Sequence, residues 1–353
     1  MRNLSLFADA LIVYTTAMNY ISQQQKQARK PPHELLISAG IWFAILCWGG
    51  AYVAARFLLH PTAPQQVALS PALLAALRFG IASFFFVLPL AHAIRQRQVS
   101  THQLLLMALL GQLAFSLYYW LQYFGIQQTD ASIAAILGVG LIPMFTTLLA
   151  QAFGQERLHA SLFAALCLGF GGVALIILQQ PFSTGLHSGF FLGALCLVSN
   201  TFLFAFYSNL SKRWMQDISP MVLTGGTMIS GAIGLVLLSL LDPAGNQWKK
   251  VLLLEVNQWI ALLFLAVGCS VLAYFTYNVA LSKRDASRVA VYFYVEPIVT
   301  VVLGMALLGE HLTWQIIAGA IAIGASVVIV NLMKRQEKHS GFSSMQEQTP
   351  NKR

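Results

Sequence analysis

The sequence predicts an all-α polytopic membrane protein with ten transmembrane helices, arranged as two inverted repeats of five helices. One observation is the composition: 57% of the residues are apolar and 9% are charged, unlike most soluble domains. Another is a series of apolar windows, each about 20 residues long, the length that spans the hydrocarbon of a bilayer. A third is a motif that recurs in the two halves of the chain, which indicates internal duplication.

The apolar windows are expected to be helices, because a backbone polar group in lipid must be paired within its own segment. The residue alternation typical of a membrane β-barrel is absent from the sequence. The expected spans, in chain order, are approximately 36–58, 72–94, 102–125, 130–152, 159–179, 188–210, 220–241, 257–281, 287–308 and 312–333.

The two ends of the chain differ from these spans. We expect residues 1–33 to form an N-terminal cytoplasmic extension and residues 334–353 a disordered, polar cytoplasmic tail. Within the extension, residues 4–21 are moderately apolar, so an interfacial helix and an additional span are both open. A cleaved signal peptide fits poorly, because the basic cluster follows this apolar stretch and does not precede it.

The duplicated motif sets the domain boundaries. Asp130-Ala131-Ser132 and Asp285-Ala286-Ser287 each open a long apolar segment, 155 residues apart. A proline interrupts each segment and an acidic residue closes it; these residues are Pro143, Glu156, Pro297 and Glu310. We therefore expect a first five-helix repeat over 34–180 and a second over 186–333, the organisation of transporters built from two related halves.

The basic residues predict the orientation. Counted over alternate gaps between spans, 17 of the 21 Lys and Arg residues fall on one side and 4 on the other. The richer side is expected to be cytoplasmic, which places both termini in the cytoplasm. Because five is an odd number of spans, the second repeat is then inserted upside down. The formal net charge of +9 is thus juxtamembrane and forms no stripe of the kind that nucleic acid requires.

Signatures of soluble enzymes are missing. The sequence has no HExxH, no GxxxxGK[ST] and no GxSxG. The four cysteines lie inside predicted spans without metal-site spacing. We expect no enzyme activity, catalytic residue, metal or cofactor. A membrane-embedded enzyme acting on lipid and a channel remain the alternatives to a transporter. The expected partners are a small-molecule substrate and membrane lipid; a coupling proton is left open, as is the choice between monomer and homodimer.

Glu296 is the sharpest candidate site residue. It lies about 14 Å along its predicted helix, near the middle of the membrane. A carboxyl group at this depth is costly and is presumed functional by default. It could bind a substrate amine or carry a coupling proton. The alternative is a structural acid that shapes the kink at Pro297.

Other candidates share helix faces. Tyr292 and Thr300 lie four residues to either side of Glu296, so the three follow one face, which lines a cavity or bonds another helix. Tyr119 and Tyr274 are separated by the repeat offset of 155 residues and could line the cavity near its pseudo-symmetry axis, with a position at the bilayer interface as the alternative. The candidate substrate-binding or coupling residues are Glu296, Tyr292, Thr300, Tyr274, Asn278, Tyr119 and Trp48.

Three further residues carry alternatives. Arg78 either snorkels to the surface or pairs with an acid or a substrate carboxylate, and a structural role is favoured over a functional one. Tyr123 lies late in its span, where an interfacial belt is one interpretation. Asp130 precedes the start of a helix, so capping is the default expectation and a gating salt bridge the lesser alternative.

A family resemblance rests on Trp48-Gly49-Gly50, Leu77-Arg78-Phe79, the two Asp-Ala-Ser openings, and Glu296-Pro297 followed by Gly309-Glu310-His311-Leu312. Over roughly 36–333 the chain resembles EamA-type members of the drug/metabolite transporter superfamily. The resemblance implies ten helices in two inverted halves, a central cavity, and transport of a small metabolite, often outward. It does not identify the substrate, because members carry amino acids, nucleotide-like compounds, sugars and drugs; we expect an amino acid, nucleotide-like compound or drug. The inverted repeats themselves favour transport by alternating access. It also implies the bacterial inner membrane. The first half departs from the pattern, with Ile142-Pro143 where the second has Glu-Pro.

Overall fold

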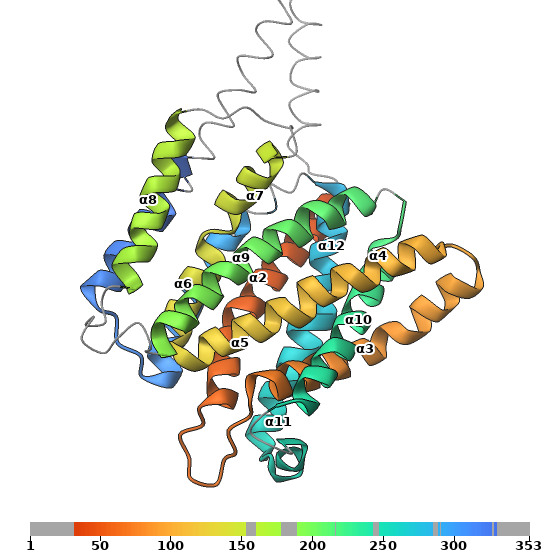
Figure 1. Ribbon diagram of the computed structural model, residues 1–353, viewed down its shortest axis with the longest axis horizontal. Helices are drawn as coiled ribbons and strands as arrows, with labels where there is room; N and C mark the ends of the chain where they lie inside the picture. Colours follow the sequence, from red (N-terminus) through yellow and green to blue (C-terminus); the bar gives the residue numbers. More distant parts are fainter. Residues whose placement is uncertain are drawn as a thin grey trace, which may run out of the picture.

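The computed structural model describes residues 32–152, 160–177, 189–215, 217–242, 247–284, 289, 291–326, 328 and 329. Throughout these residues the regular elements are helices, in agreement with the predicted all-α fold (Figure 1). Several features singled out from the sequence lie outside the described residues: the apolar stretch 4–21, Glu156, Asp285–Arg288 and the tail from 334 onward.

Among the residues that the structure describes, six helical segments are long and apolar enough to cross a membrane: Leu36–Leu59, Pro71–Arg95, Thr101–Gln128, Gly189–Ser211, Pro220–Leu240 and Val256–Lys283. Four shorter apolar helices follow in the remaining predicted windows: Ala131–Thr146, Cys167–Ile176, Val295–Leu308 and Trp314–Ser326. Each of the ten windows thus contains one apolar helix. Large apolar side chains such as Phe84 (78% exposed) and Leu88 (79%) cover the outer surface, as expected where lipid is the solvent.

The second helix of each repeat begins in the same way. Ser70 precedes α3 (Pro71–Arg95), and Ser219 precedes α10 (Pro220–Leu240). Each serine hydroxyl accepts a 3.3 Å hydrogen bond from a backbone N–H of the first turn, and proline at the first position needs no hydrogen-bond acceptor. The two helices pack against each other, one from each repeat.

The third helices of the repeats are matched in length and in an irregularity. The segments Thr101–Gln128 and Val256–Lys283 are each 28 residues long. The first is α4 (Thr101–Gly111), the π-helical η1 (Gln112–Leu117) and α5 (Tyr118–Gln128); the second is α11 (Val256–Leu263), the π-helical η4 (Phe264–Leu272) and α12 (Ala273–Lys283). Such π-helical insertions frequently mark functional sites. Here η1 immediately precedes α5 and η4 immediately precedes α12, the two helices that carry the tyrosines.

The fourth span of each repeat changes its helical geometry along its length. In the first repeat, α6 (Ala131–Gly140) gives way at Leu141 to α7 (Ile142–Ala152). In the second, η5 (Val291–Tyr294) is followed by α14 (Val295–Leu303) and η6 (Gly304–Leu308). Proline follows the first residue of α7 and lies in the first turn of α14, where its missing N–H is tolerated.

The repeats are interleaved. From the first repeat, α2 (Pro32–Leu59) packs against α12 and α14. From the second, α9 (Gly189–Trp214) packs against α5, α6 and α7. The buried core is therefore shared between the repeats, and the pairing of α2 is mirrored by that of α9.

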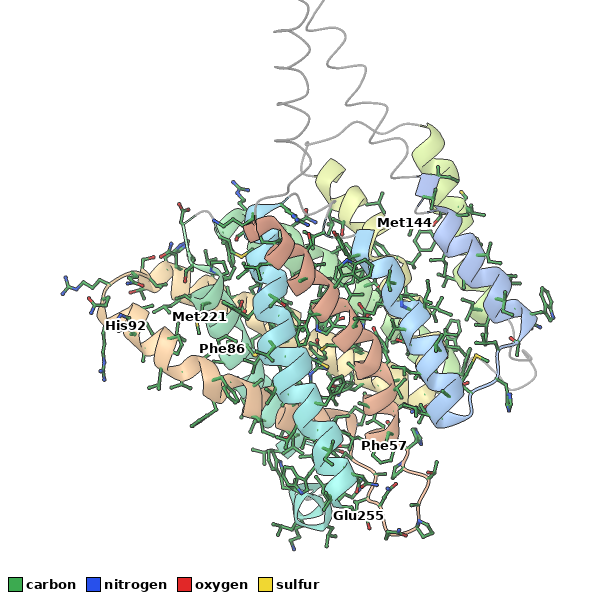
Figure 2. The ribbon with its side chains drawn as sticks, turned by 180° about the vertical axis from the view of Figure 1, so that it is seen from behind. Phe57, Phe86, His92, Met144, Met221 and Glu255 are labelled. Carbon is green, nitrogen blue, oxygen red and sulfur yellow. The ribbon has the colours of Figure 1, made fainter. Side chains whose placement is uncertain are left out.

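The fifth helices stand at one edge of the molecule. Helix α8 (Ala160–Ile177) lies beside Trp314–Ser326 in both views, opposite the α3–α4 hairpin that carries His92 (Figures 1 and 2). A Cβ atom on Gly172 would lie 2.7 Å from the Gly319 carbonyl oxygen. Glycine at this position therefore allows the two helices their close approach.

Candidate functional site

A central cavity lies where the two repeats meet. Its volume is about 20 Å³, roughly the room that one water molecule needs. The lining combines eight aromatic residues with one basic, one acidic and one amide side chain: Trp48, Tyr52, Tyr118, Tyr119, Tyr123, Phe204, Tyr274, Phe293, Arg78, Glu296 and Gln122, completed by Ala51, Ile126, Val139 and Ile142. This conformation is therefore contracted around its centre.

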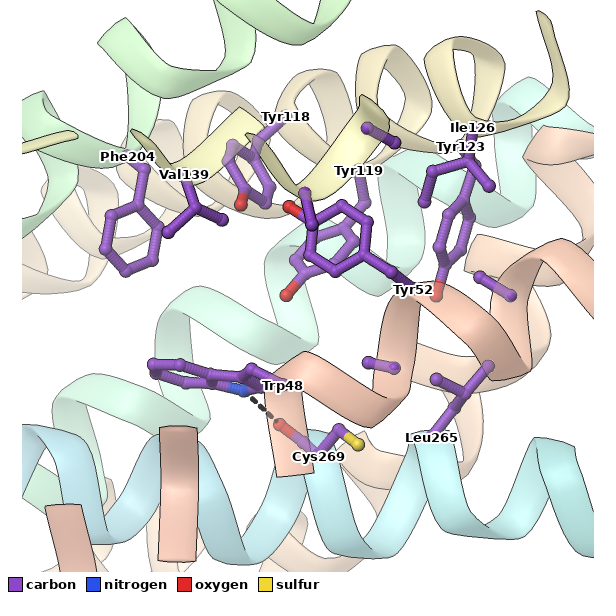
Figure 3. Close-up of a cluster of buried hydrophobic side chains, with 14 of the residues drawn as sticks. Trp48, Tyr52, Tyr118, Tyr119, Tyr123, Ile126, Val139, Phe204, Leu265 and Cys269 are labelled. Carbon is purple, nitrogen blue, oxygen red and sulfur yellow. Dashed lines mark hydrogen bonds between the residues drawn. The ribbon is translucent and has the colours of Figure 1, made fainter. Parts of the chain in front are cut away.

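Trp48 on α2 forms one wall of the cavity. Its indole Nε1–H donates a 2.8 Å hydrogen bond to the carbonyl oxygen of Cys269 in η4 (Figure 3). Its ring stacks on Phe293 of η5, with centroids 5.7 Å apart and planes at 8°. Two elements of the second repeat thus hold the orientation of this first-repeat residue.

The two tyrosines separated by the repeat offset contact each other. The hydroxyls of Tyr119 on α5 and Tyr274 on α12 lie 2.8 Å apart and share a hydrogen bond across the repeat interface. Both side chains line the cavity. Tyr119 and Tyr274 occupy the same position in the two repeats, and such positions are equivalent about a pseudo-symmetry axis.

A polar cluster beside this pair was not predicted. Gln122 Nε2 donates to the hydroxyl of Tyr52 at 2.7 Å and to that of Tyr118 at 3.4 Å. All three residues line the cavity, and Tyr118 projects from α5 on the cavity side in Figure 3. The available signal was the dense run of tyrosine and glutamine in residues 118–123.

Arg78 is the site residue whose importance the sequence interpretation underestimated. It is 2% exposed on α3, so the alternative in which it snorkels to the surface is wrong. Its Nε donates to Ser270 Oγ at 2.7 Å and one terminal nitrogen donates to Tyr123 at 2.8 Å, while the other terminal nitrogen is buried without a partner. Tyr123 is accordingly a buried hydrogen-bond partner of Arg78 and does not belong to an interfacial belt.

Glu296 belongs to the second repeat, lies in the first turn of α14 and is 3% exposed. Its Oε2 atom is buried without a hydrogen-bond partner. At the equivalent point of the first repeat, Ile142 also lines the cavity. The site is therefore asymmetric: it contains one carboxyl group, contributed by the second repeat, and one guanidinium group, contributed by the first.

The other three predicted residues lie away from the cavity lining. Tyr292 packs edge-on against Trp42, with centroids 5.3 Å apart. Thr300 donates a 2.7 Å hydrogen bond to the Gly49 carbonyl and ties α14 to α2. Asn278 donates to Tyr207 and Thr224 at 3.0 and 2.7 Å, between α12, α9 and α10. Their contacts in this conformation are between helices.

A second set of contacts closes the end of the molecule that the charge distribution assigns to the outside. Glu310 of the second repeat accepts hydrogen bonds from the backbone N–H groups of Ala131 and Ser132, at 2.7 and 3.0 Å, and from the Ser132 hydroxyl at 2.5 Å. It thereby caps α6 of the first repeat. The expectation that the Asp130 side chain caps this helix is wrong, because that side chain makes no capping bond and instead lies 3.6 Å from Arg56.

This arrangement is that of a polytopic helical membrane protein with a cavity between two sequence repeats. The model of the EamA-like transporter family matches residues 37–178 and again residues 191–332. The chain belongs to this family, and is therefore a transporter of the drug/metabolite type and not an enzyme.

Relatives in other organisms agree with the assignment. An uncharacterized transporter of Bacillus subtilis, YyaM, is 26% identical over 72% of this chain and 82% of its own. An uncharacterized transporter of Archaeoglobus fulgidus is 25% identical over 80% and 94% of the two chains. A protein of Salmonella typhimurium named a probable amino-acid metabolite efflux pump is 28% identical over 81% and 91%.

The fold also has a counterpart among solved structures. One crystal structure superposes with a TM-score of 0.57 at 18% sequence identity, covering 85% of this chain and 98% of the other. At this identity the match speaks for the fold alone.

Proposed function

We propose that this transporter is a secondary carrier that exports a small metabolite by alternating access. The observation that carries the proposal is the central cavity, which side chains from both repeats line. Because the cavity holds about 20 Å³, no metabolite fits until the repeats move apart. A cavity that must open to load, and that two related halves enclose, suits exchange of access between the two sides of a membrane.

The capping of α6 by Glu310 supports a closed outer side. The contact joins the two repeats, and its three bonds to one carboxylate combine charge assistance with the positive end of a helix dipole. Arg56 reinforces this end, because its guanidinium donates to the carbonyls of Ile126 and Gln127 at 2.8 and 3.0 Å. Outward opening then requires these bonds to break, and we call this set of contacts the outer seal.

The proposed orientation follows from the distribution of basic residues. Residues 34–180 and 186–333 form the two repeats, inserted with opposite orientation into the inner membrane with both termini cytoplasmic. A single cysteine introduced at position 65, an exposed residue in the loop after α2, is then labelled from outside intact cells. A cysteine at position 97 requires permeabilisation, and labelling of position 97 from outside contradicts the orientation.

Within the site, we assign substrate contact to Glu296, Trp48, Tyr119 and Tyr274. Tyr292, Thr300 and Asn278 hold the cavity-lining helices against their neighbours, through the contacts described above. Glu296 either binds the substrate or carries a coupling proton. The substrate classes are amino acids, nucleotide-like compounds and drugs. The name of the Salmonella typhimurium relative supports export and places amino-acid metabolites first among them.

Counterflow in proteoliposomes tests the proposal. Purified protein is reconstituted into liposomes preloaded with one unlabelled solute, and uptake of the same labelled solute is followed for amino acids, nucleotide-like metabolites and cationic dyes. We expect saturable accumulation for at least one class, absent from protein-free liposomes. The variant Arg95→Gln, exposed at the end of α3, serves as the matched active control.

Two outcomes contradict the proposal. The first is the absence of counterflow for every class with protein that elutes as a folded species. The second is flux that rises linearly with concentration without saturation, which indicates a channel and not a carrier.

A further inference from the structure

We infer that the cavity binds a zwitterionic amino acid, with the substrate carboxylate on Arg78 and the substrate ammonium group on Glu296. The inference rests on the proposed transport function and names the substrate class of that same site. Its basis is a pair of buried, oppositely charged side chains that line one cavity, each with a polar atom that has no partner in the protein.

The guanidinium of Arg78 is held in a fixed position. Two of its nitrogens donate to Ser270 Oγ and the Tyr123 hydroxyl, at 2.7 and 2.8 Å. Its central carbon lies 5.0 Å from the ring centroid of Phe79 and 4.7 Å from that of Tyr119, distances at which aromatic rings attract a cation. These contacts leave one terminal nitrogen for a ligand. A planar guanidinium in a fixed orientation is the side chain best suited to recognise a carboxylate.

Glu296 presents the complementary group. Its Oε2 atom is buried and has no hydrogen-bond donor in the protein. An ionised carboxylate has only acceptor atoms, and an ammonium group has only donors. The start of α14 therefore offers an acceptor for a substrate amine, while α3 offers a donor for a substrate carboxylate.

The two charged side chains do not satisfy each other. No ion pair joins Arg78 and Glu296, although both side chains are described and both line the cavity. A ligand with a single charge would leave one of them buried and unpaired, which is strongly unfavourable. An α-amino acid carries both charges on groups attached to one carbon atom, so a single small ligand can satisfy both.

The rest of the lining identifies the side chain of this amino acid. Trp48, Tyr118, Phe204 and Phe293 contribute aromatic walls, and Val139 and Ile142 add aliphatic surface. Aromatic rings pack favourably with one another in edge-on or offset geometries. The lining therefore favours a flat apolar side chain, and phenylalanine is the appropriate probe.

Three probes that share one aromatic ring separate the two charges. L-phenylalanine has both charges, phenethylamine lacks the carboxylate, and 3-phenylpropanoate lacks the ammonium group. Binding is measured by calorimetry on the purified full chain and transport by counterflow. We expect each singly charged probe to bind at least about 30-fold more weakly than phenylalanine, the loss typical of leaving one buried charge unpaired.

Two substitutions test the assignment of each charge. Arg78→Gln should weaken phenylalanine and 3-phenylpropanoate on the order of 30-fold and should bind phenethylamine at least as tightly as the wild type, because the charge that this probe leaves unpaired is gone. Glu296→Gln should weaken phenylalanine and phenethylamine and should bind 3-phenylpropanoate at least as tightly as the wild type, for the same reason. Arg78→Lys keeps the charge and should retain intermediate binding of phenylalanine. Asp217→Asn and Arg95→Gln, both at exposed residues, are the matched controls, and thermal unfolding checks that every variant is folded.

Each other outcome overturns the inference. Equal binding of the three probes to the wild-type protein shows that the site does not recognise the ammonium and carboxylate groups. Equal weakening of all three probes in either variant shows a structural role for that residue, and Arg78→Lys then serves as the folded variant if Arg78→Gln unfolds. If phenylalanine is not bound while another solute of the broader panel shows counterflow, the zwitterion assignment fails and the transport function stands.

Discussion

Charged side chains are paired at the outer seal, whereas in the central cavity they keep atoms without a partner. At the seal, Glu310 receives three hydrogen bonds and the guanidinium of Arg56 lies against Asp130 and two carbonyls. In the cavity, Arg78 and Glu296 each retain a buried atom without a partner. A satisfied charge holds a conformation in place, whereas an unsatisfied one in a dry site is poised for a ligand. The same two residue types therefore serve closure in one region and recognition in the other.

The largest expected effect is at Glu296, because nothing else in the cavity lining supplies a negative charge. Glu296→Gln keeps the shape of the side chain but removes the titratable group, so transport should fall on the order of 100-fold and lose its dependence on pH. Glu296→Asp should keep partial activity, since the charge remains but is one methylene short. Initial counterflow rates over a range of pH measure both effects.

Wild-type rates and an unchanged pH profile in Glu296→Gln would show that the acid is structural. The substrate site would then have to be sought among Tyr119, Tyr274 and Asn278, and the difference drawn here between the outer seal and the cavity would no longer hold.

The next effect is at Glu310, which joins the repeats at the seal. Glu310→Ala removes three bonds and should expose the N-terminus of α6, so that a cysteine introduced at position 129, buried in the closed form, reacts faster from outside. Each charge-assisted bond contributes about 1.5–3 kcal/mol, so labelling should accelerate at least about tenfold. Glu310→Gln retains one acceptor oxygen and should have an intermediate effect. Unaltered labelling in Glu310→Ala would show that this contact does not close the outer side.

A smaller difference is expected within the Arg56–Asp130 pair. Asp130 is about half exposed, so Asp130→Asn should change stability by about 1 kcal/mol or less. Arg56→Gln should cost more, because it also removes two bonds to backbone carbonyls. Thermal unfolding in detergent compares the two variants. A greater loss from Asp130→Asn than from Arg56→Gln would reverse the roles assigned here.

The smallest effect concerns the hydroxyl pair at the repeat interface. Tyr119→Phe and Tyr274→Phe each remove the same hydrogen bond, which between membrane helices averages about 0.6 kcal/mol. In a double-mutant cycle the two losses should not add, because either substitution alone already breaks the bond. Fully additive losses would mean that each hydroxyl has another partner.

The succession of helices could be predicted from the sequence because it depends on local properties. Apolar length gives the spans, and the repeated Asp-Ala-Ser and proline residues give the duplication. The equal offset of Tyr119 and Tyr274 suggested that both could line a cavity near the axis, since a duplicated chain places equivalent residues about one axis, but their direct hydrogen bond was not predicted. Glu296 could be identified for a related reason: a lone carboxyl group in a long apolar segment has few structural uses.

Contacts between distant segments could not be predicted in this way. The partners of Arg78 are set by how α3, α5 and η4 pack, so the sequence left open whether this residue reaches the surface or pairs inside, where the structure places it. The cap of α6 is a residue 179 positions away, and local capping rules pointed to Asp130 instead. Tyr292, Thr300 and Asn278 each lie about one helical turn from a cavity residue, but they contact neighbouring helices and do not line the cavity.

By itself, the sequence determined that this chain is a helical membrane protein in two repeats, because apolar length and internal duplication are properties of the chain alone. Only the tertiary structure decided which charged side chains satisfy one another and which two face a common cavity. The physical reason is that hydrogen bonds reach about 3 Å, so the fate of each charge depends on the packing of helices that the sequence places far apart.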